Sequence, residues 1–361
     1  MEIDLLCVGN ALVDVFAQAD GQLFIRHGLN QPVQHIGIEK LKEILSELPK
    51  YTAISGGAQK PHARHRACFP EEGNTACPPE NLSPLRIVSG GGTANVAKIA
   101  ALLGVKVSFT GAIGNDELGR LFKKSLAAAG AKLRLSKKPS PTGICLMLRD
   151  EGDGTHSETR IAASPSAALE LSESDIGGEE LRKARVVLID GFMLDKSALA
   201  FNVLRLAGQN GIAAAIDLSS PGIAREYAAE IAGLAKQYPL ILFMNKAEAE
   251  AFREGLSAAK QEAPFENNTN FPIIVVKLGQ DGAICYSGGR ITRAETQAVT
   301  PVDATGAGDA FCAGFLAAWV KNKTPGECAA FGNMAAKTVL GAEGSQADKK
   351  ALQTLAKLLR K

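Results

Sequence analysis

Residues 303–309 read Asp-Ala-Thr-Gly-Ala-Gly-Asp, and an apolar segment follows them directly. In that segment Phe311, Phe315 and Trp319 recur every four residues, so they lie along one stripe of a helix. Gly306 and Gly308 therefore precede the helix or form its first turn. First-turn N–H groups lack partners within the helix and lie at the positive end of its dipole. The stretch therefore predicts a binding site for an anion such as phosphate.

Asp309 places a carboxylate beside this predicted anion site. Because a carboxylate repels a phosphate, a loop that only binds phosphate would be better without it. The residue makes chemical sense as a general base that takes the proton from a hydroxyl group attacking phosphorus. The simpler interpretation is that Asp309 only interacts with the helix N-terminus and that the glycines only turn the chain. The motifs elsewhere in the chain favour the catalytic interpretation.

The composition limits the possible classes of protein. The length of 361 residues allows one large α/β domain or two ordinary ones. Apolar residues make up 46%, which is enough for a sizeable core, and only 5% of residues are aromatic, so aliphatic side chains and alanine must dominate it. The net charge of +2 is too balanced to indicate a nucleic-acid partner.

The chain shows no sign of a membrane or secreted protein. No apolar run approaches the roughly 18–20 residues of a membrane span. The start of the chain carries Glu2 and Asp4, where a signal peptide carries bases. The seven cysteines are scattered and do not indicate a disulfide framework. We therefore expect a cytoplasmic protein with no membrane partner.

The first strand predicts one side of a ligand site. Ile3–Val8 is a continuous apolar run, as in a buried strand of a parallel sheet, and it ends at Gly9 and Asn10. Open α/β sheets bind ligands beyond the carboxyl ends of their strands, so Asn10 and Asp14 are placed to hold substrate hydroxyl groups. Ordinary turn chemistry explains the two residues equally well.

The next third of the chain is less regular. Residues 15–38 suggest short strands outside the main sheet, and residues 49–86, rich in Pro, Gly, His and Arg, suggest a long surface insertion. Ser89–Asn95 contains three glycines and is predicted to open a helix, with the Asn95 amide available to a hydroxyl group. Residues 142–148 and 155–161 flank a turn and predict a β-hairpin that covers a substrate.

A regular α/β alternation follows and indicates parallel strands with right-handed crossovers. The predicted strands are 186–190, 213–217, 240–244 and 273–277, and the predicted helices lie near 195–209, 222–236 and 246–254. Residues 326–340 and 347–360 predict two further helices after the one that follows Asp309.

Two of these strand ends carry candidate ligand residues. Asn245 and Glu248 share a helical face and could hold the water shell of Mg²⁺, although an Asn cap followed by Glu three positions later is also an ordinary capping pattern. Lys277, Gly279 and Gly282 could bring charge and backbone amides to a nucleotide, although a hairpin turn would explain the glycines.

Together these motifs resemble the ribokinase-like, or PfkB, family of carbohydrate and nucleoside kinases. The resemblance covers nearly the whole chain apart from about 49–86. It is carried by two signatures, Gly90–Asn95 with Gly111–Asp116 and Asp303–Asp309, and by Asn-x-x-Glu at 245–248. It implies a three-layer α/β/α fold with a mostly parallel central sheet. It also implies a single kinase domain over 1–361, with a small β-sheet lid from about 11–38 and 140–163.

The chain is most similar to the adenosine-kinase-like branch of that family. Gly9-Asn10 with Asp14, Gly91-Gly92 with Asn95 and Lys98, and Thr142-Gly143 agree with that branch. The resemblance implies ATP-dependent phosphorylation of a hydroxyl group of adenosine or a related ribonucleoside or sugar. A sugar kinase for ribose, fructose or a keto-deoxy sugar acid remains an alternative. The lid motif departs from the family order, because it reads Ser157-Glu158-Thr159-Arg160.

The resemblance also implies roles for individual residues. In catalysis these are Asp309, Gly306, Ala307 and Gly308. In substrate binding they are Asn10, Asp14, Gly91, Gly92, Asn95 and Arg160. In ATP binding they are Asn245, Lys277, Gly279, Gly282, Thr305, Gly306, Gly308 and Asn333. Asn245 and Glu248 would hold Mg²⁺ through water, and Asp303 is a candidate near a monovalent cation such as K⁺.

Two other classes of protein compete with the kinase. A non-catalytic module that senses sugars or nucleosides could share the fold, although it would need neither Asp309 nor the anion loop. A dinucleotide-dependent oxidoreductase is disfavoured because no Gly-x-Gly-x-x-Gly follows the first strand. The protein could be a monomer or a homodimer that pairs through the lid.

Overall fold

The computed structural model describes residues 2–19, 21–31, 33–48, 85–150, 158–261, 273–297, 299, 304–341 and 348–359. Their strands are β1 (Ile3–Val8), β2 (Leu12–Gln18), β3 (Val33–His35), β4 (Leu85–Gly90), β5 (Val107–Gly114), β6 (Lys132–Lys138), β7 (Gly143–Asp150), β8 (Glu158–Ser164), β9 (Ala184–Asp190), β10 (Ala213–Asp217), β11 (Leu240–Asn245), β12 (Ile273–Lys277), β13 (Ala283–Ser287) and β14 (Arg290–Ala294). Their helices are α1 (Gly21–Arg26), α2 (Ile38–Glu47), α3 (Gly92–Leu102), α4 (Glu117–Ala128), α5 (Gly178–Arg182), α6 (Ser197–Gln209), α7 (Pro221–Glu226), α8 (Ala228–Ala235), α9 (Lys246–Ala258), α10 (Ala307–Trp319), α11 (Pro325–Lys337) and α12 (Lys349–Leu358).

Most of these strands form one large sheet, in the order β14-β13-β12-β11-β10-β9-β1-β5-β6 among the described residues. The strands from β12 to β6 run parallel to their neighbours, and β13 and β14 are antiparallel. The α/β fold with a mostly parallel central sheet, predicted from the sequence, is confirmed. The four strands predicted in the regular alternation correspond to β9, β10, β11 and β12.

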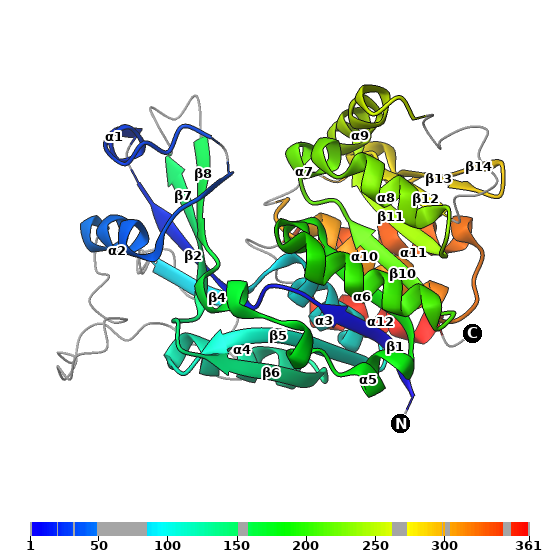
Figure 1. The fold of residues 1–361 in the computed structure, drawn as a ribbon, viewed down its shortest axis with the longest axis horizontal. Coiled ribbons are helices and arrows are strands. Elements are labelled where there is room, and N and C mark those ends of the chain that lie inside the picture. The colour runs from blue at the N-terminus through cyan, green and yellow to red at the C-terminus, as the bar shows by residue number, and fades with distance from the viewer. Residues whose placement is uncertain are drawn as a thin grey trace.

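Helices cover both faces of the large sheet (Figure 1). Alternate residues of the central strands point to opposite faces, so Cys7 belongs to one buried core and Val8 to the other. The core that contains Cys7 includes α3, α4, α10, α11 and α12, and the core that contains Val8 includes α5, α6, α7, α8 and α9. The rings of Phe243 and Phe315 meet edge to face at 5.1 Å between α10 and the sheet. Their packing fixes the helix whose first turn carries Asp309.

A smaller sheet, in the order β3-β8-β7-β2-β4, stands to one side of the large sheet (Figure 1). One face belongs to the core that includes α2, through residues such as Val13 and Val15. The register pairs Asp14 with Cys145 and Phe16 with Met147, which places these four residues together on the opposite face. The predicted hairpin of residues 142–161 corresponds to β7 and β8, which pair antiparallel.

Several local predictions were wrong. Residues 21–26 form the helix α1, where short strands were expected, because Leu23 and Phe24 are buried together on one side of it. Ser89 and Gly90 end β4 instead of opening a helix, and β4 begins at Leu85, within the predicted insertion. The remainder of that insertion, residues 49–84, lies outside the described residues. Pairing with β2 explains β4, because the ladder outweighs the weak strand propensity of its glycine.

Two boundaries also differ. From the sequence, a strand is predicted over Val105–Thr110 and a loop over Gly111–Asp116, whereas β5 continues to Gly114 because it pairs with β6 along its length. The helix predicted over 222–236 is divided at Tyr227 into α7 and α8. Among the described residues, no helix is both long and apolar enough to cross a membrane.

Candidate active site

Polar side chains gather where the parallel strands of the large sheet end. Asn10 follows β1, Asp190 ends β9, Asp217 ends β10, Asn245 ends β11 and Lys277 ends β12. Because these strands are parallel neighbours, their carboxyl ends meet at one edge, which is where open α/β sheets bind ligands.

The N-termini of α3 and α10 also meet at this edge. Nδ2 of Asn95, in the first turn of α3, donates to Oδ2 of Asp309, in the first turn of α10, at 2.9 Å. A Cβ atom added to Gly92 would lie 3.4 Å from Oδ1 of Asp309 and 3.8 Å from Oδ2 of Asp190. Two residues predicted to contact substrate therefore lie directly beside the predicted base.

The glycines of the predicted anion-binding loop lie at the start of α10. Gly306 precedes the helix with φ of +80°, a left-handed conformation that glycine adopts without strain. The N–H of Ala307 donates to the carbonyl of Ala304 at 3.2 Å, and Gly308 follows in the first turn. Asp309 does not cap the helix by its side chain, since that carboxylate accepts from Asn95 on another helix.

Asp309 has the electrostatic surroundings of a proton acceptor. Burial raises the pKa of its carboxyl group to about 7. The hydrogen bond from Asn95 and the charge of Lys277 act to lower this pKa, whereas the charges of Asp217 and Asp190 raise it. A group with a pKa near neutral pH is suited to accept and release a proton.

Asp14 lies on the facing side of the site. Its side chain is 3% exposed, and burial raises its pKa to about 7, against a lowering contribution from Lys98. Its carboxylate occupies the space above Gly90, where an added Cβ would lie 1.9 Å from Oδ1. The next residue, Gly91, has φ of +93°, and a Cβ there would lie 2.4 Å from the carbonyl oxygen of Asn10. The glycines therefore let the start of α3 close onto Asn10 and Asp14.

Asp190 is a site residue that the sequence analysis missed. Its Oδ2 accepts from the N–H of Thr93 at 3.2 Å and from Oγ1 of Thr93 at 2.6 Å, which fixes the first turn of α3. Its Oδ1 and the Oδ1 of Asn10 are buried and have no hydrogen-bond partner among the described residues. The signal that could have identified Asp190 is its position as a polar residue at the end of a continuous apolar strand, because the same pattern identified Asn10.

Asn245 and Glu248 form the reciprocal capping pattern that was one of their two interpretations. Oδ1 of Asn245 accepts from the N–H of Glu248 at 2.9 Å, and the Glu248 carboxylate accepts from N and Nδ2 of Asn245 at 2.8 and 2.7 Å. Glu248 is 3% exposed, and burial raises its pKa. Each of these oxygens keeps a lone pair that the capping hydrogen bonds do not use. Mg²⁺ binds oxygen ligands and keeps most of its waters, so the pair fits an ion held through its water shell.

The predicted nucleotide side comes together around Ala294. Gly282 approaches its carbonyl so closely that an added Cβ would lie 2.1 Å from the oxygen. Nδ2 of Asn333 donates to the same carbonyl at 2.9 Å and to that of Glu295 at 3.3 Å. Gly279 begins a short 3₁₀ turn, Gly279–Asp281, after β12. Thr305 is half-buried beside Gly306, and the predicted cation residue Asp303 lies outside the described residues.

The structure does not bring Arg160 to the site. Arg160 pairs with Leu148, and Leu148 pairs with Ala17, whose side chain belongs to the core beside α2. Asp14 points to the other face of the small sheet, because it is three residues from Ala17 on the same strand. The arginine of the lid motif therefore lies on the face of the small sheet opposite to Asp14.

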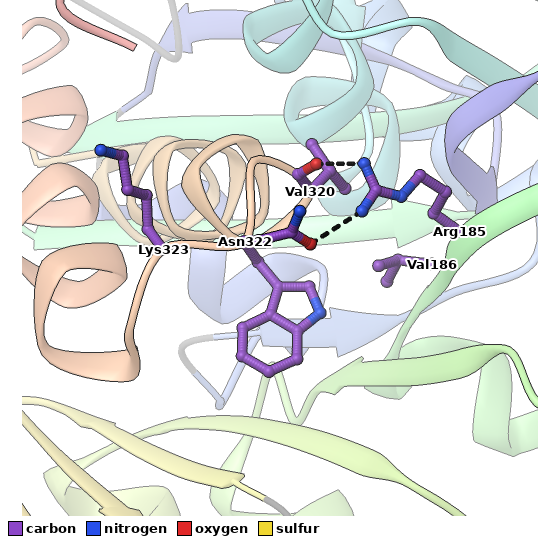
Figure 2. A pocket seen from close by; sticks show the side chains of 6 residues that line it. Arg185, Val186, Val320, Asn322 and Lys323 are labelled. Carbon is purple, nitrogen blue, oxygen red and sulfur yellow. Dashed lines mark hydrogen bonds between the residues drawn. The ribbon is translucent and has the colours of Figure 1, made fainter. Parts of the chain in front are cut away.

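A groove of about 320 Å³ lies far from these residues (Figure 2). It is lined by Arg185, at the start of β9, and by Trp319, at the end of α10. The guanidinium of Arg185 donates to the carbonyl of Val320 and, at 2.9 Å, to Oδ1 of Asn322. Asp190 and Asp309 occupy the opposite ends of the same strand and helix, so this groove is not part of the site.

The sequence also matches a known family model, described as the pfkB family of carbohydrate kinases, over residues 70–352. The chain belongs to this family. It is therefore a phosphotransferase that uses ATP and an alcohol acceptor, and it acts on a small-molecule sugar or nucleoside.

Relatives and solved structures agree with this assignment. The chain is 26% identical to adenosine kinase 1 of Arabidopsis thaliana, covering 94% of both chains. It is 27% identical to a ribokinase of the same plant, over 80% of this chain and 76% of that one. The crystal structure of adenosine kinase from Sinorhizobium meliloti superposes with a TM-score of 0.77, at 23% identity over 99% of both chains. The adenosine-kinase-like branch of the ribokinase-like fold, expected from the motifs, is confirmed.

The raised pKa of Asp309 predicts that its charge destabilises the folded kinase. An acid with a raised pKa carries no such penalty below its unfolded pKa of about 3.9, and the full penalty above its folded pKa of about 7. Each pKa unit corresponds to about 1.4 kcal/mol. Because the side chain is only half-buried, we expect Asp309→Asn to raise the free energy of unfolding by about 2 kcal/mol at pH 8 and by almost nothing at pH 4. Urea denaturation at both pH values measures this. Equal stability at pH 8 would contradict the burial argument.

Proposed function

We propose that this kinase transfers the γ-phosphoryl group of ATP to a primary hydroxyl of a ribonucleoside or a related sugar, with Asp309 as the general base. One observation carries the proposal. The Asp309 carboxylate lies in the first turn of α10, beside Gly308 and bonded to Asn95, with a pKa of about 7. A proton acceptor and an anion site therefore share one helix turn.

The reaction follows from that placement. Asp309 takes the proton of the acceptor hydroxyl. The hydroxyl oxygen then forms a bond to the γ-phosphorus, and the bond between the γ-phosphorus and the oxygen that bridges it to the β-phosphate breaks to release ADP. Phosphoryl transfer depends mostly on positioning and electrostatic stabilisation. The N–H groups of Gly306 and Gly308 would donate hydrogen bonds to the negatively charged oxygens of the transferred group. The N–H of Ala307 would first have to exchange its hydrogen bond to the carbonyl of Ala304 for one to the phosphate.

Asn245 and Glu248 are the residues proposed to hold Mg²⁺ through its water shell. When bound, Mg²⁺ would neutralise charge on the phosphates of ATP. The two side chains end β11 and begin α9, at the same edge as Lys277 and Asp217. Their mutual hydrogen bonds hold the two side chains in place before any ligand binds.

The acceptor would lie between Asn10, Asp14, Gly92 and Asn95. The buried Oδ1 atoms of Asn10 and Asp190, which have no partner among the described residues, fit a ligand that donates hydroxyl hydrogens. Phe16 and Met147 lie on the same face of the small sheet as Asp14, and their half-buried side chains would offer an apolar surface for a nucleobase. The guanidinium of Arg86 lies 5.3 Å from the centroid of the Phe16 ring and would border that surface. From their residue type alone, Phe24 and Phe109 are also candidates for that surface, but both are buried in the core.

The small sheet is proposed to act as the lid over the acceptor. It carries Asp14 on the face away from α2, so movement of the sheet would carry Asp14 with it. Several adenosine kinases, as well as a probable sugar kinase from Rhizobium etli, share this fold, and these likenesses support both a nucleoside and a sugar as acceptor. A sugar kinase is therefore the second candidate, favoured by the two buried acceptor oxygens.

We predict that the protein, with ATP and magnesium, releases ADP when given adenosine or a related ribonucleoside. Ribose, fructose and a keto-deoxy sugar acid complete the panel of acceptors. Asp309→Asn should bind ATP normally and lose at least about 10²-fold in kcat, because general-base catalysis supplies about 10²–10⁴-fold. Activity close to wild type in this variant would refute the assigned base. ATP binding without ADP release from any acceptor would favour a non-catalytic sensor.

A second prediction concerns magnesium. Glu248→Ala should raise the magnesium concentration needed for half-maximal activity, because it removes an oxygen proposed to hold the ion's water shell. The matched control is Glu327→Ala, since Thr324 and Glu327 form the same reciprocal cap at the start of α11. Glu327 lies in an exposed capping box that no step of the reaction uses. If both variants leave the magnesium titration unchanged, Glu248 is a capping residue only.

A further inference from the structure

Lys277 is held in an unusual way for a lysine that borders a nucleotide loop. Its Nζ lies 2.8 Å from Oδ1 and 2.8 Å from Oδ2 of Asp217, and the two side chains are 15% and 12% exposed. The ammonium group therefore points across the sheet toward β10, and not along the turn that begins at Gly279. Burial lowers the pKa of Lys277, but the charge and hydrogen bond of Asp217, together with the electrostatic contributions of Cys312 and Glu248, outweigh burial and raise the pKa above its usual value.

A third residue completes this cluster from α10. Sγ of Cys312 donates to Oδ2 of Asp217 at 3.2 Å, and it lies 3.9 Å from Nζ of Lys277. Cys312 follows Asp309 by three residues, so the two share a face of α10. The cluster therefore connects β10 and β12 to the helix that carries the predicted base.

The ammonium group lies directly against the anion loop. A Cβ atom added to Gly308 would be 3.5 Å from Nζ of Lys277. Nζ of Lys277 bonds both carboxylate oxygens of Asp217, and among the described residues its other contact is the sulfur of Cys312 at 3.9 Å. A phosphate oxygen at the first turn of α10 would therefore meet a fixed, fully charged donor.

We propose that Lys277 is a catalytic residue that bonds the transferred phosphoryl group, and that Asp217 and Cys312 are positioning residues that hold its ammonium group against Gly308. This inference rests on the proposed function and deepens it. A charge fixed before the reaction stabilises the transition state without reorganisation. The positive charge of Lys277 also offsets part of the negative charge of Asp190, Asp217 and Asp309, which would otherwise repel the phosphates of ATP.

The competing explanation is a structural ion pair that only ties β10 to β12. A buried ion pair is weak evidence for stability, and replacing it with apolar residues of similar volume is often neutral. The kinase carries a matched structural pair for comparison. Nζ of Lys138 lies 2.7 Å from Oδ2 of Asp175, with side chains 16% and 14% exposed. Lys138 ends β6, an edge strand of the large sheet that β5 separates from β1.

The test compares steady-state kinetics of the full chain and its variants with ATP, magnesium and the best acceptor. Lys277→Met should lower kcat by about 10²-fold or more, as for loss of one oxyanion donor, with little change in KM for the acceptor. Because that variant leaves Asp217 buried and unpaired, the double variant Lys277→Met/Asp217→Leu is measured beside it and should show the same loss. Lys138→Met should keep the wild-type kcat.

Asp217→Asn provides a readout that a structural role would not move. Asp217→Asn removes the largest contribution that raises the pKa of Lys277, while burial, which lowers the pKa, and the charge of Glu248, which raises it, remain. The variant should therefore be active near pH 7 and lose activity as the pH rises toward 10. Wild type should show no such decline over the same range. Cys312→Ala should give a smaller shift in the same direction.

The outcomes separate this inference from the function on which it rests. If wild type transfers phosphate while Lys277→Met, the double variant and Asp217→Asn retain its kcat and pH profile, the pair is only structural and the inference is overturned. If wild type phosphorylates no acceptor, the proposed function fails and this inference falls with it.

Discussion

The hydrogen bond from Asn95 to Asp309 is the contact on which the rest of the site depends. It joins the first turns of α3 and α10, two helices that come from distant parts of the chain. Each helix arrives there for its own reason: α10 because Phe311 and Phe315 pack on Phe243 of the sheet, and α3 because Thr93 bonds Asp190. The result is a carboxylate held between two helix N-termini.

That arrangement is electrostatically demanding. Asp190, Asp217 and Asp309 lie near one another, and the charges of the first two raise the pKa of Asp309. Lys277 offsets them from β12, and the starts of two helices add the positive ends of their dipoles. A carboxyl group that loses its proton near neutral pH is the consequence. The fold tolerates this costly group because the packed sheet and helices over-determine its position.

The fold class and most of the site could be predicted from the sequence, because they depend on local patterns. Continuous apolar strands that end in a polar residue identified Asn10 and Asn245, and the glycine stretch before Phe311 identified the start of α10. Asp190 and Asp217 obey the same rule and were missed, because an acid that ends a strand carries no motif of its own. The features that the sequence did not predict depend on strand register and on side-chain packing between distant parts of the chain. The face on which Arg160 lies depends on its register with Leu148, and Phe109 is buried by packing on Phe122 at 5.5 Å, which no local pattern predicts.

The most direct test of the account is the pH dependence of kcat/KM for the wild-type kinase with its best acceptor. If Asp309 is the base, only its ionised form is active. Because burial raises its pKa to about 7, kcat/KM should rise about tenfold per pH unit below that value and level off above it. A profile that is flat from pH 5 to pH 8 would contradict the central claim that this carboxylate, held between α3 and α10, accepts the proton.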